Sequence, residues 1–286
     1  MASLREMINR NSLVEAPAVF NPLSAKLAEE AGFPALYLGG GGLGYIQGVT
    51  EANLTITEMV RIGIDIRTVC RLPLILDGAC GFGDPMHLHR TINMAEAAGF
   101  AAIEIEDQIL PKRAHHHVGI EHMIPAELMA AKIGEAVRAR RDRDFVIIGR
   151  TNALRSSTMD EALRRAELYR QAGADMLFVT AHKVEHFRYL GERLAPPLVT
   201  LTTAGQLKKM GLTKDDLISL GFRLLVDPVT PVLVFHEALK QCYRAIASGN
   251  SEALLGHGGL KAELDAVHQT IGLEQMLVIE RQTVEL

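Results

Sequence analysis

Short apolar runs alternate with amphipathic stretches from near the start of the chain to about residue 248. The apolar runs lack a clean alternation of apolar and polar positions, which is typical of parallel strands covered on both faces. We expect strands at 17–20, 35–40, 72–77, 101–107, 145–151, 175–180, 197–201 and 223–227. The stretches between them predict helices at 24–31, 57–70, 85–98, 126–140, 159–172, 184–190, 214–220 and 232–247.

Eight strands that are each followed by a helix predict an α/β fold, namely a (β/α)8 TIM barrel. Several of the predicted helices close with a glycine in a C-cap position, as in EEAGF, EAAGF and RQAGAD. An open, doubly wound sheet is the structural alternative. No linker rich in Pro, Gly or Ser and no break in composition divides the chain, so we expect a single domain over 1–286.

The last stretch, 249–286, predicts an additional C-terminal helical segment with no strand to return to. Its apolar residues form a stripe that must be buried against another surface. That surface is either the chain's own barrel or a partner subunit. The residues of the stripe are Leu254, Leu260, Leu264, Val267, Ile271 and Met276.

Composition narrows the class of protein. Hydrophobic residues make up 48% of the chain and charged residues 22%, which supports a large buried core and argues against disorder. The net charge is −4 and no basic stripe is interleaved with aromatics, so we expect no nucleic-acid partner. No apolar run approaches the length of a membrane span, and three cysteines are too few for a disulfide framework. We therefore expect a soluble, cytoplasmic protein with no membrane partner.

In a TIM barrel the active site lies at the carboxyl ends of the strands, so polar residues there come first. The second predicted strand runs into four glycines, Gly39 to Gly42, which either present backbone N–H groups to an anion or form a tight turn. The third ends in Asp77 after the apolar run LPLIL. A carboxylate in that position is costly unless it meets a metal or another cation.

The fourth predicted strand carries two acids. Since side chains alternate along a strand, Glu104 and Glu106 share one face, toward the barrel interior, and Ile103 and Ile105 face the helices. Glu106 is predicted to serve either a metal site or an internal salt bridge. With Asp77 on the adjacent strand, it is suited to bind a hard cation such as Mg²⁺ through oxygen ligands and water.

Basic residues follow at the mouth of the barrel. Lys112 and Arg113 suit an anionic substrate, and so does Arg150, which ends the fifth strand and pairs either with a substrate carboxylate or with Glu106. The histidine triplet that begins at His115 supplies a general acid or base, ligates a metal such as Mn²⁺, Fe²⁺ or Zn²⁺, or is a solvated loop. In a loop, His115 and His117 can face the same way.

Five segments, taken in order, resemble motifs of the isocitrate lyase / phosphoenolpyruvate mutase superfamily. They are YLGGGG, LPLILDGACGFG, IEIEDQILPKR, IIGRTNA and LGFRLLVDPVTP, which are similar to the family's glycine-rich, DADxGYG, IEDQxxPK, ARTDA and YPLTA-like motifs. The chain most resembles the methylisocitrate lyase, dimethylmalate lyase and oxaloacetate decarboxylase branches. The resemblance implies a (β/α)8 barrel, Mg²⁺ or Mn²⁺, and a homotetramer (a dimer of dimers) built by exchange of the C-terminal helices.

The resemblance also implies roles for individual residues. Asp77 matches the acid that binds the metal directly, and Glu106 matches an acid that holds metal-bound water. Lys112 matches the lysine of a gating loop and Arg150 the arginine that contacts the substrate. The predicted substrate-binding set is completed by the backbone donors Gly40 and Gly41 and by Tyr37, Gly39 and Asn53.

The chain departs from the family pattern at several positions. The second aspartate of DADxGYG is Ala79, and an acid expected after the second strand is Asn53, with Glu51 close enough to compensate. Ala114 stands where the lyases have their catalytic cysteine. Acid and amide positions after the sixth and seventh strands read Thr180 and the threonine-rich stretch 200–203. Fewer acids weaken a site for a hard cation unless histidine nitrogens enter it and select a softer metal.

These observations predict a metal-dependent carbon–carbon lyase or decarboxylase that acts on a small 2-hydroxy or 2-oxo (di)carboxylic acid. Arg150 and the glycine amides fix the anionic oxygens, and a metal-stabilised enolate forms on cleavage. His115 or His117 replaces the missing cysteine as proton donor. The alternatives are a metal-dependent C–C or C–P hydrolase of the same superfamily and a catalytically inactive, ligand-binding barrel.

Overall fold

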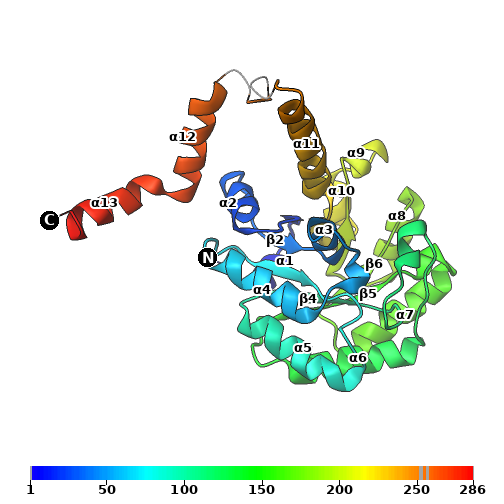
Figure 1. Cartoon of the computed structure of the whole chain (residues 1–286). Coiled ribbons are helices and arrows are strands. Elements are labelled where there is room, and N and C mark those ends of the chain that lie inside the picture. Colours follow the sequence, from blue (N-terminus) through cyan, green and yellow to red (C-terminus); the bar gives the residue numbers. More distant parts are fainter. Residues whose placement is uncertain (1, 251–253, 256–257, 286) are drawn as a thin grey trace. The chain divides into compact units, whose positions relative to one another are not determined.

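The computed structural model describes residues 2–250, 254–255 and 258–285. It divides into two compact units, Met1–Val232 and Leu233–Leu286. The first unit holds all the strands of the described residues, and the second is helical (Figure 1).

Eight parallel strands form the first unit. Their order in the sheet is β1-β8-β7-β6-β5-β4-β3-β2, and an isolated bridge between Ala18 and Tyr37 joins β1 to β2, so the sheet nearly closes on itself (Figure 1). The predicted TIM barrel is confirmed, and the open, doubly wound alternative is wrong. The strands are β1 (Val14–Pro17), β2 (Leu36–Leu38), β3 (Leu74–Asp77), β4 (Ala102–Glu106), β5 (Val146–Thr151), β6 (Met176–Val179), β7 (Leu198–Leu201) and β8 (Phe222–Asp227).

Each predicted helix is present with ends close to the expected ones. Most begin at a polar N-cap, such as Asn21 before α2 and Thr55 before α4, whose side chain accepts a hydrogen bond from a first-turn amide. These helices are α2 (Pro22–Glu30), α4 (Ile56–Arg67), α5 (Pro85–Ala97), α6 (Ala126–Ala139), α7 (Met159–Gln171), α8 (Val184–Arg193), α10 (Lys214–Ser219) and α11 (Thr230–Ala247).

Several short helical segments were not expected. All of them except α1 lie in loops that follow the strands and carry residues of the cavity described below. The set comprises α1 (Leu4–Ile8), α3 (Gly40–Ile46), η1 (Glu51–Asn53), η2 (Ala114–Val118), η3 (Ala153–Arg155) and α9 (Gln206–Lys209). The first predicted strand, 17–20, overlaps β1 only at Pro17. The next two residues still bond to the neighbouring strands, since the amides of Ala18 and Val19 donate to the carbonyls of Asp227 and Tyr37.

The core has two layers. Ile103 and Ile105 of β4 belong to the outer layer, between the sheet and the helices, while Ala102 belongs to the layer inside the barrel. The alternation therefore places Glu104 and Glu106 on the interior face, as the sequence predicted. Leu4 and Ile8 of α1 join the inner layer.

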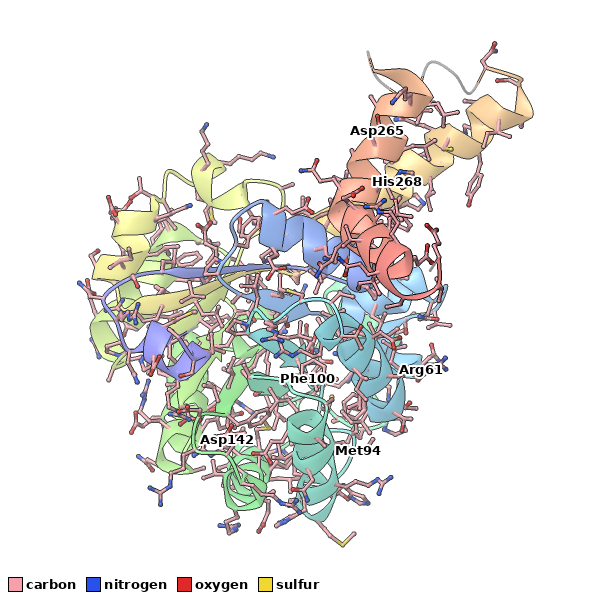
Figure 2. The ribbon with its side chains drawn as sticks, turned by 90° about the vertical axis from the view of Figure 1, so that its left-hand side faces the viewer. Arg61, Met94, Phe100, Asp142, Asp265 and His268 are labelled. Atoms are coloured by element: carbon pink, nitrogen blue, oxygen red, sulfur yellow. The ribbon has the colours of Figure 1, made fainter. Side chains whose placement is uncertain are left out.

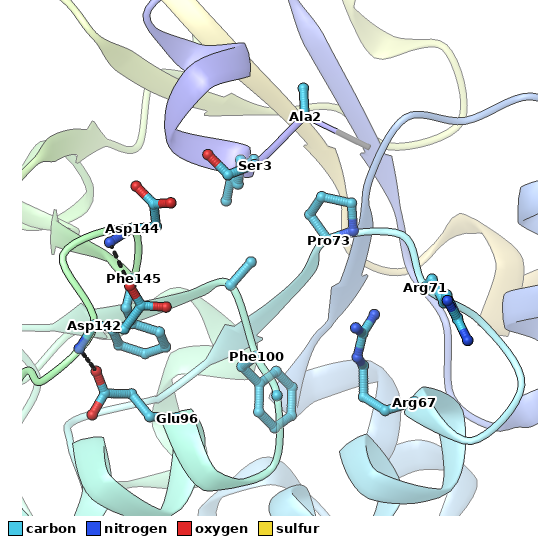
Figure 3. Close-up of a pocket in the computed structure, with 13 residues that line it drawn as sticks. Ala2, Ser3, Arg67, Arg71, Pro73, Glu96, Phe100, Asp142, Asp144 and Phe145 are labelled. Atoms are coloured by element: carbon cyan, nitrogen blue, oxygen red, sulfur yellow. Dashed lines mark hydrogen bonds between the residues drawn. The ribbon is translucent and has the colours of Figure 1, made fainter.

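The amino-terminal end of the barrel holds a cavity of about 380 Å³ (Figure 3). Its charged groups mostly support loops: Arg67 donates to the carbonyls of Cys70 and Leu72, and Glu96 accepts from the amides of Arg141 and Asp142. In a TIM barrel this end serves stability, and catalysis takes place at the opposite end. We therefore look for the site at the carboxyl ends of the strands.

The second unit contains α12 (Gly259–Ile271) and α13 (Leu273–Thr283), joined at Gly272, which has a left-handed φ of 73°. Figure 2 labels Asp265 of α12, which pairs with Lys261 one turn earlier at 2.8 Å. The predicted helical tail is present, although 251–253, 256–257 and 286 lie outside the described residues. Apolar side chains stay exposed along both helices: Leu260, Leu264, Val267, Ile271, Met276 and Ile279. Within the described ranges, no helix combines the length and apolar character needed to cross a bilayer.

Candidate active site

A cavity of about 390 Å³ lies at the carboxyl ends of the strands. Tyr37 of β2, Asp77 of β3 and Arg150 of β5 line it, together with residues from the loops that follow the strands. The barrel thus brings together side chains that are far apart in the sequence. Gly39, Gly41, Glu51, Lys112, His116 and His117 complete the part of the wall considered next.

Asp77 is held rigidly at the end of β3. One oxygen accepts from the amide of Gly40 at 3.0 Å, and the other accepts from the amide of Ala79 at 2.9 Å. A Cβ added at Gly40 would lie 3.4 Å from Asp77 Oδ2 and 3.5 Å from Glu51 Oε2, so both carboxylates face this glycine. Burial, reinforced by the negative charge of Glu51, raises the pKa of Asp77 against the lowering effect of Lys112.

Lys112 lies between two buried acids. Its Nζ is 2.6 Å from Glu51 Oε1 and hydrogen-bonds Glu106 Oε1, and all three side chains are under a tenth exposed. Although burial opposes ionisation, Lys112 and Arg150 hold the pKa of Glu106 below its usual range. The same acids, despite burial, raise the pKa of Lys112. One ammonium therefore neutralises part of an acidic cluster made by Asp77, Glu51 and Glu106.

Arg150 pairs with Glu104, the interior acid for which the sequence predicted no partner. Its Nη1 donates to Glu104 Oε1 at 2.6 Å, whereas Glu106 lies 3.5 Å from its Nε. Tyr37 donates its hydroxyl to the other oxygen of Glu104 at 3.2 Å. The guanidinium lies 4.9 Å from the centre of the Phe178 ring. Burial raises the pKa of Glu104 to about 7, against the lowering effect of Arg150.

Asn152 was not singled out by the sequence. It is fully buried, and its Nδ2 donates to Glu106 Oε2 at 2.8 Å. Its Oδ1 accepts from the Thr180 hydroxyl at 2.9 Å and from Arg150 Nε at 3.2 Å. Asn152 therefore orients both Glu106 and Arg150. Its place directly after a strand end, in the segment RTNA, is the signal that could have found it.

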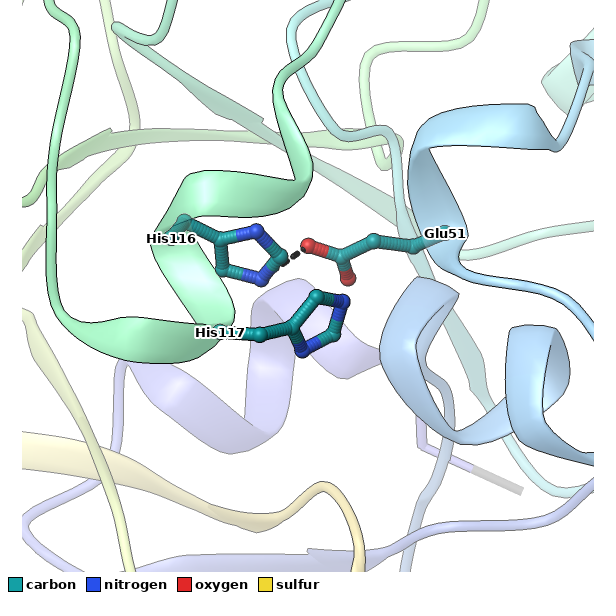
Figure 4. A group of neighbouring side chains, drawn as sticks. All are labelled: Glu51, His116 and His117. Carbon is teal, nitrogen blue, oxygen red and sulfur yellow. Dashed lines mark ion pairs between the residues drawn. The ribbon is translucent and has the colours of Figure 1, made fainter.

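The histidine triplet lies on η2 and is split between two environments. His116 and His117 lie beside Glu51 (Figure 4). His116 Nε2 is 2.6 Å from Glu51 Oε1, and His117 stacks against His116 with ring centres 4.0 Å apart. His115 points elsewhere: its Nδ1 is 3.0 Å from Nε2 of His122, and it is not among the residues that line the cavity. The expectation that His115 and His117 face the same way is wrong, because a 3₁₀ turn repeats about every three residues rather than every two.

Two sets of side chains offer donors of the kinds that bind cations, and in one of them the ligand atoms lie close together. Glu51, His116 and His117 offer ligand atoms that all lie within 4.8 Å of one another (Figure 4). The second set is the oxygen cluster of Asp77, Glu51 and Glu106, where the Lys112 ammonium already serves as an internal cation. Carboxylate oxygens suit Mg²⁺ and Mn²⁺, and imidazole nitrogens favour softer ions.

The remaining predicted substrate contacts are partly met. Tyr37, Gly39 and Gly41 line the cavity, but the amide of Gly40 is already bonded to Asp77. Asn53 is not among the lining residues; its Oδ1 accepts from the Thr50 hydroxyl at 3.3 Å, within the turn that presents Glu51. Glu51 therefore lines the cavity in the position that was predicted for Asn53.

Comparison with known proteins gives a consistent picture. The family model described as phosphoenolpyruvate phosphomutase matches residues 4–247. A 2-methylisocitrate lyase of Aeropyrum pernix is 39% identical over 83% of this chain and 75% of its own. A 2,3-dimethylmalate lyase of Eubacterium barkeri is 31% identical over 98% and 96%, and an oxaloacetate decarboxylase of Pseudomonas putida is 33% identical over 85% and 83%.

Solved structures of related proteins have the same fold. A phosphoenolpyruvate phosphomutase from Streptomyces platensis subsp. rosaceus superimposes with a TM-score of 0.89 at 27% identity, covering 98% of each chain. A phosphonopyruvate hydrolase complexed with oxalate and Mg²⁺ gives 0.85 at 27% identity, again over 98% of each chain.

Proposed function

The chain belongs to the phosphoenolpyruvate phosphomutase family, and from this premise we propose that it is a metal-dependent carbon–carbon lyase or decarboxylase. Its substrate is a small 2-hydroxy or 2-oxo (di)carboxylic acid. Curated relatives that cover most of the chain, at 31% to 39% identity, are lyases or a decarboxylase of such acids. The observation that carries the proposal is the meeting of a buried acidic cluster with Arg150 in one cavity.

The hydrolase alternative is weaker. The phosphonopyruvate hydrolases superimpose at 27% to 28% identity and the 2,3-dimethylmalate lyase at 25% to 26%, so the solved structures favour neither activity. The preference for a lyase comes from the relatives found by sequence, which are lyases and a decarboxylase. Lys112 and Arg150 both line the cavity, and each pairs with a buried acid behind it, Glu106 and Glu104. A barrel that only binds a ligand does not account for the cost of burying these charges.

The oxygen donors fit a hard cation. We propose that Asp77 binds Mg²⁺ or Mn²⁺ and that Glu106 and Glu51 hold its water ligands. A divalent cation bound there would polarise the substrate carbonyl and offset the charge that develops on its oxygen as an enolate forms. A softer ion on Glu51, His116 and His117 is the alternative that the histidine-containing donor set supports.

Arg150 anchors the substrate carboxylate. Glu104 accepts a hydrogen bond from its Nη1 and Asn152 accepts one from its Nε, so the guanidinium is held in one orientation beside the cavity. A guanidinium fixed in this way matches the geometry of a carboxylate without losing rotamer freedom on binding. The backbone amides of Gly39 and Gly41 lie in the same wall and supply further donors.

A proton must reach the carbon from which the leaving fragment departs. Ala114 cannot supply it, and His115 is paired with His122 away from the cavity. We therefore assign the donor to the pair that lines the cavity, His116 and His117. Glu51 orients His116, and the hydroxyl oxygen of Tyr45 lies 3.3 Å from Nδ1 of His117.

We also propose that the chain forms a homotetramer in which the C-terminal helical segment, 249–286, packs on another copy. The exposed apolar side chains of α12 and α13 support this. A cytoplasmic location and the absence of a nucleic-acid partner stay predictions.

The test combines metal content with turnover. Purified protein would be analysed for bound metals and assayed on a panel of 2-oxo and 2-hydroxy diacids, with release of pyruvate or another 2-oxo acid as the readout. We expect Mg²⁺- or Mn²⁺-dependent turnover that drops at least about 100-fold in Asp77→Asn and Arg150→Gln, a loss typical of removing a charge-stabilising group. Full activity in either folded variant would overturn the proposal.

A further inference from the structure

One lysine is buried in the helical layer of the barrel and does not line the active-site cavity. Lys132 of α6 is 2% exposed, and within the described ranges no carboxylate lies at ion-pair distance from its amino group. Its Nζ instead donates a hydrogen bond to the backbone carbonyl of Cys80. Burial lowers the pKa of Lys132. An apolar side chain of similar length would avoid the cost of burying an amino group, so the contact with Cys80 is what the lysine provides.

Cys80 belongs to the loop of residues 78–84, which joins β3 to α5. The backbone of this loop is strained at two non-glycine residues, since Ala79 has a φ of 45° and Phe82 a φ of 56°. A left-handed conformation brings the Cβ of an L-residue too close to the backbone, and it persists only where surrounding contacts hold it. The hydrogen bond from Lys132 reaches the loop between the two strained residues and is such a contact.

The same loop holds two acids of the site. The amide of Ala79 donates to Asp77 Oδ1 at 2.9 Å, and the carbonyl of Ala79 accepts from the amide of Glu106 at 2.8 Å. Both bonds pass through the residue directly before the carbonyl that Lys132 holds. If the φ of Ala79 returned to a negative value, the peptide planes beside it would rotate and neither bond would keep its geometry.

We propose that Lys132 is a positioning residue: its hydrogen bond keeps Ala79 in the left-handed conformation that orients Asp77 for a bound cation. The inference rests on the proposed function, in which Asp77 binds Mg²⁺ or Mn²⁺. The hydroxyl of Thr91 does not replace Lys132, because it donates to Gly81, where a φ of 79° costs little. Lys132 acts through the backbone and touches neither the metal nor the substrate.

Calorimetric titration of Mg²⁺ into metal-free protein tests the role of Lys132. Lys132→Met keeps the length of the side chain and removes the donor. We expect it to weaken Mg²⁺ binding by about 10–100-fold, as for other groups that orient a metal ligand. Lys132→Gln, whose side chain is one bond shorter and no longer reaches Cys80, should show the same loss and serves as the test if Lys132→Met does not fold.

Leu190→Ala is the matched control for a loss of stability. Leu190 is 1% exposed on α8, and β6, the strand before α8, is separated from β3 by β4 and β5. The cavity left in the core should destabilise this variant, as the substitution of Lys132 does. Its Mg²⁺ affinity should nevertheless change by less than about threefold, because the loop after β3 is untouched.

A further substitution separates backbone positioning from core packing. Ala79→Gly removes the strain, since glycine adopts a left-handed φ at little cost. In the Lys132→Met background it should therefore restore part of the lost Mg²⁺ affinity. Hydrogen exchange of the Ala79 amide reports on the same bond in metal-free protein. We expect faster exchange in Lys132→Met than in the wild type, and no change in Leu190→Ala.

Folded Lys132→Met that binds Mg²⁺ as tightly as the wild type would overturn the inference. An equal loss of affinity in Leu190→Ala, or a loss that Ala79→Gly does not reduce, would also overturn it, because either result would assign the effect to packing. A wild-type protein that does not bind Mg²⁺ would instead count against the proposed function. In that case, faster exchange at Ala79 in Lys132→Met would still support the role of Lys132 in holding the loop.

Discussion

The ammonium of Lys112 lies 2.6 Å from a carboxylate oxygen of Glu51, with both side chains under a tenth exposed. The same ammonium donates a hydrogen bond to Glu106, and Glu51 also pairs with the imidazole of His116. A cation inside this acidic cluster therefore stabilises the fold in addition to any role in the reaction. Three carboxylates buried together repel one another unless a positive charge lies among them.

Removal of that charge should make the fold depend on added metal. We expect Lys112→Met to lower the free energy of unfolding by about 3–5 kcal/mol without divalent metal, since a buried charge pair has lost one partner. Mg²⁺ should restore more stability to this variant than to the wild type, because a bound dication supplies the missing charge. Urea denaturation with and without Mg²⁺ measures both effects.

Lys214→Met is the matched control, because Lys214 pairs with Glu15 at the surface and is 64% exposed. We expect it to change stability by no more than about 0.5 kcal/mol. An equal response of Lys112→Met and wild type to Mg²⁺ would show that the metal binds elsewhere.

The two donor sets predict opposite metal selectivities in variants. Asp77→Asn should abolish Mg²⁺ binding and leave Zn²⁺ binding largely intact, because Zn²⁺ favours the imidazoles of His116 and His117. The double variant His116→Asn/His117→Asn should show the reverse pattern. Calorimetric titration of each ion into metal-free protein measures this. If the histidine double variant lost Mg²⁺ binding while Asp77→Asn kept it, Mg²⁺ would be shown to bind at Glu51, His116 and His117 instead.

The pH dependence of stability should show the ion pair between Glu51 and His116. Glu51 raises the pKa of His116 above its ordinary value of 6.5, although burial acts the other way. A raised pKa in the folded state gives stability that is fully present below 6.5 and is lost as the pH rises through the folded value. In metal-free protein, His116→Asn should therefore be more destabilising at pH 5.5 than at pH 8.5.

Urea denaturation at both pH values gives the comparison, and His115→Asn serves as the control because His115 pairs with His122 instead of an acid. A gap between wild type and His116→Asn that is constant across this pH range would contradict the ion pair.

The apolar stripe of the last helices predicts the oligomeric state. Leu264 of α12 is 45% exposed and Ile271 is 39% exposed, so a partner surface has to cover them if the chain is a tetramer. Leu264→Glu/Ile271→Glu should reduce the mass in sedimentation to that of a smaller species, because burying a carboxylate in the interface is costly. Lys261→Glu, on the same helix at an exposed side chain that pairs with Asp265, should leave the mass unchanged. A wild-type protein that sediments as a monomer would end the proposal.

The sequence by itself determined the barrel and the end at which its chemistry lies. Strand and helix periodicities are local properties, so they identified all eight strands and placed Glu104 and Glu106 inside. The rule that parallel strands converge at their carboxyl ends then brought Asp77 and Arg150 to one cavity, where the structure has them.

Only the tertiary structure decided which side chains meet there. Strand register sets Arg150 opposite Glu106, yet its guanidinium bonds Glu104, while Lys112 and Asn152 bond Glu106. Whether Glu51 or Asn53 faces the cavity depends on one short 3₁₀ turn. The same kind of turn selected His116 over His115. These contacts depend on the paths of the loops that pack on the barrel. There, charged side chains that are distant in sequence compete for the same few partners. A local sequence pattern cannot predict which of them pair.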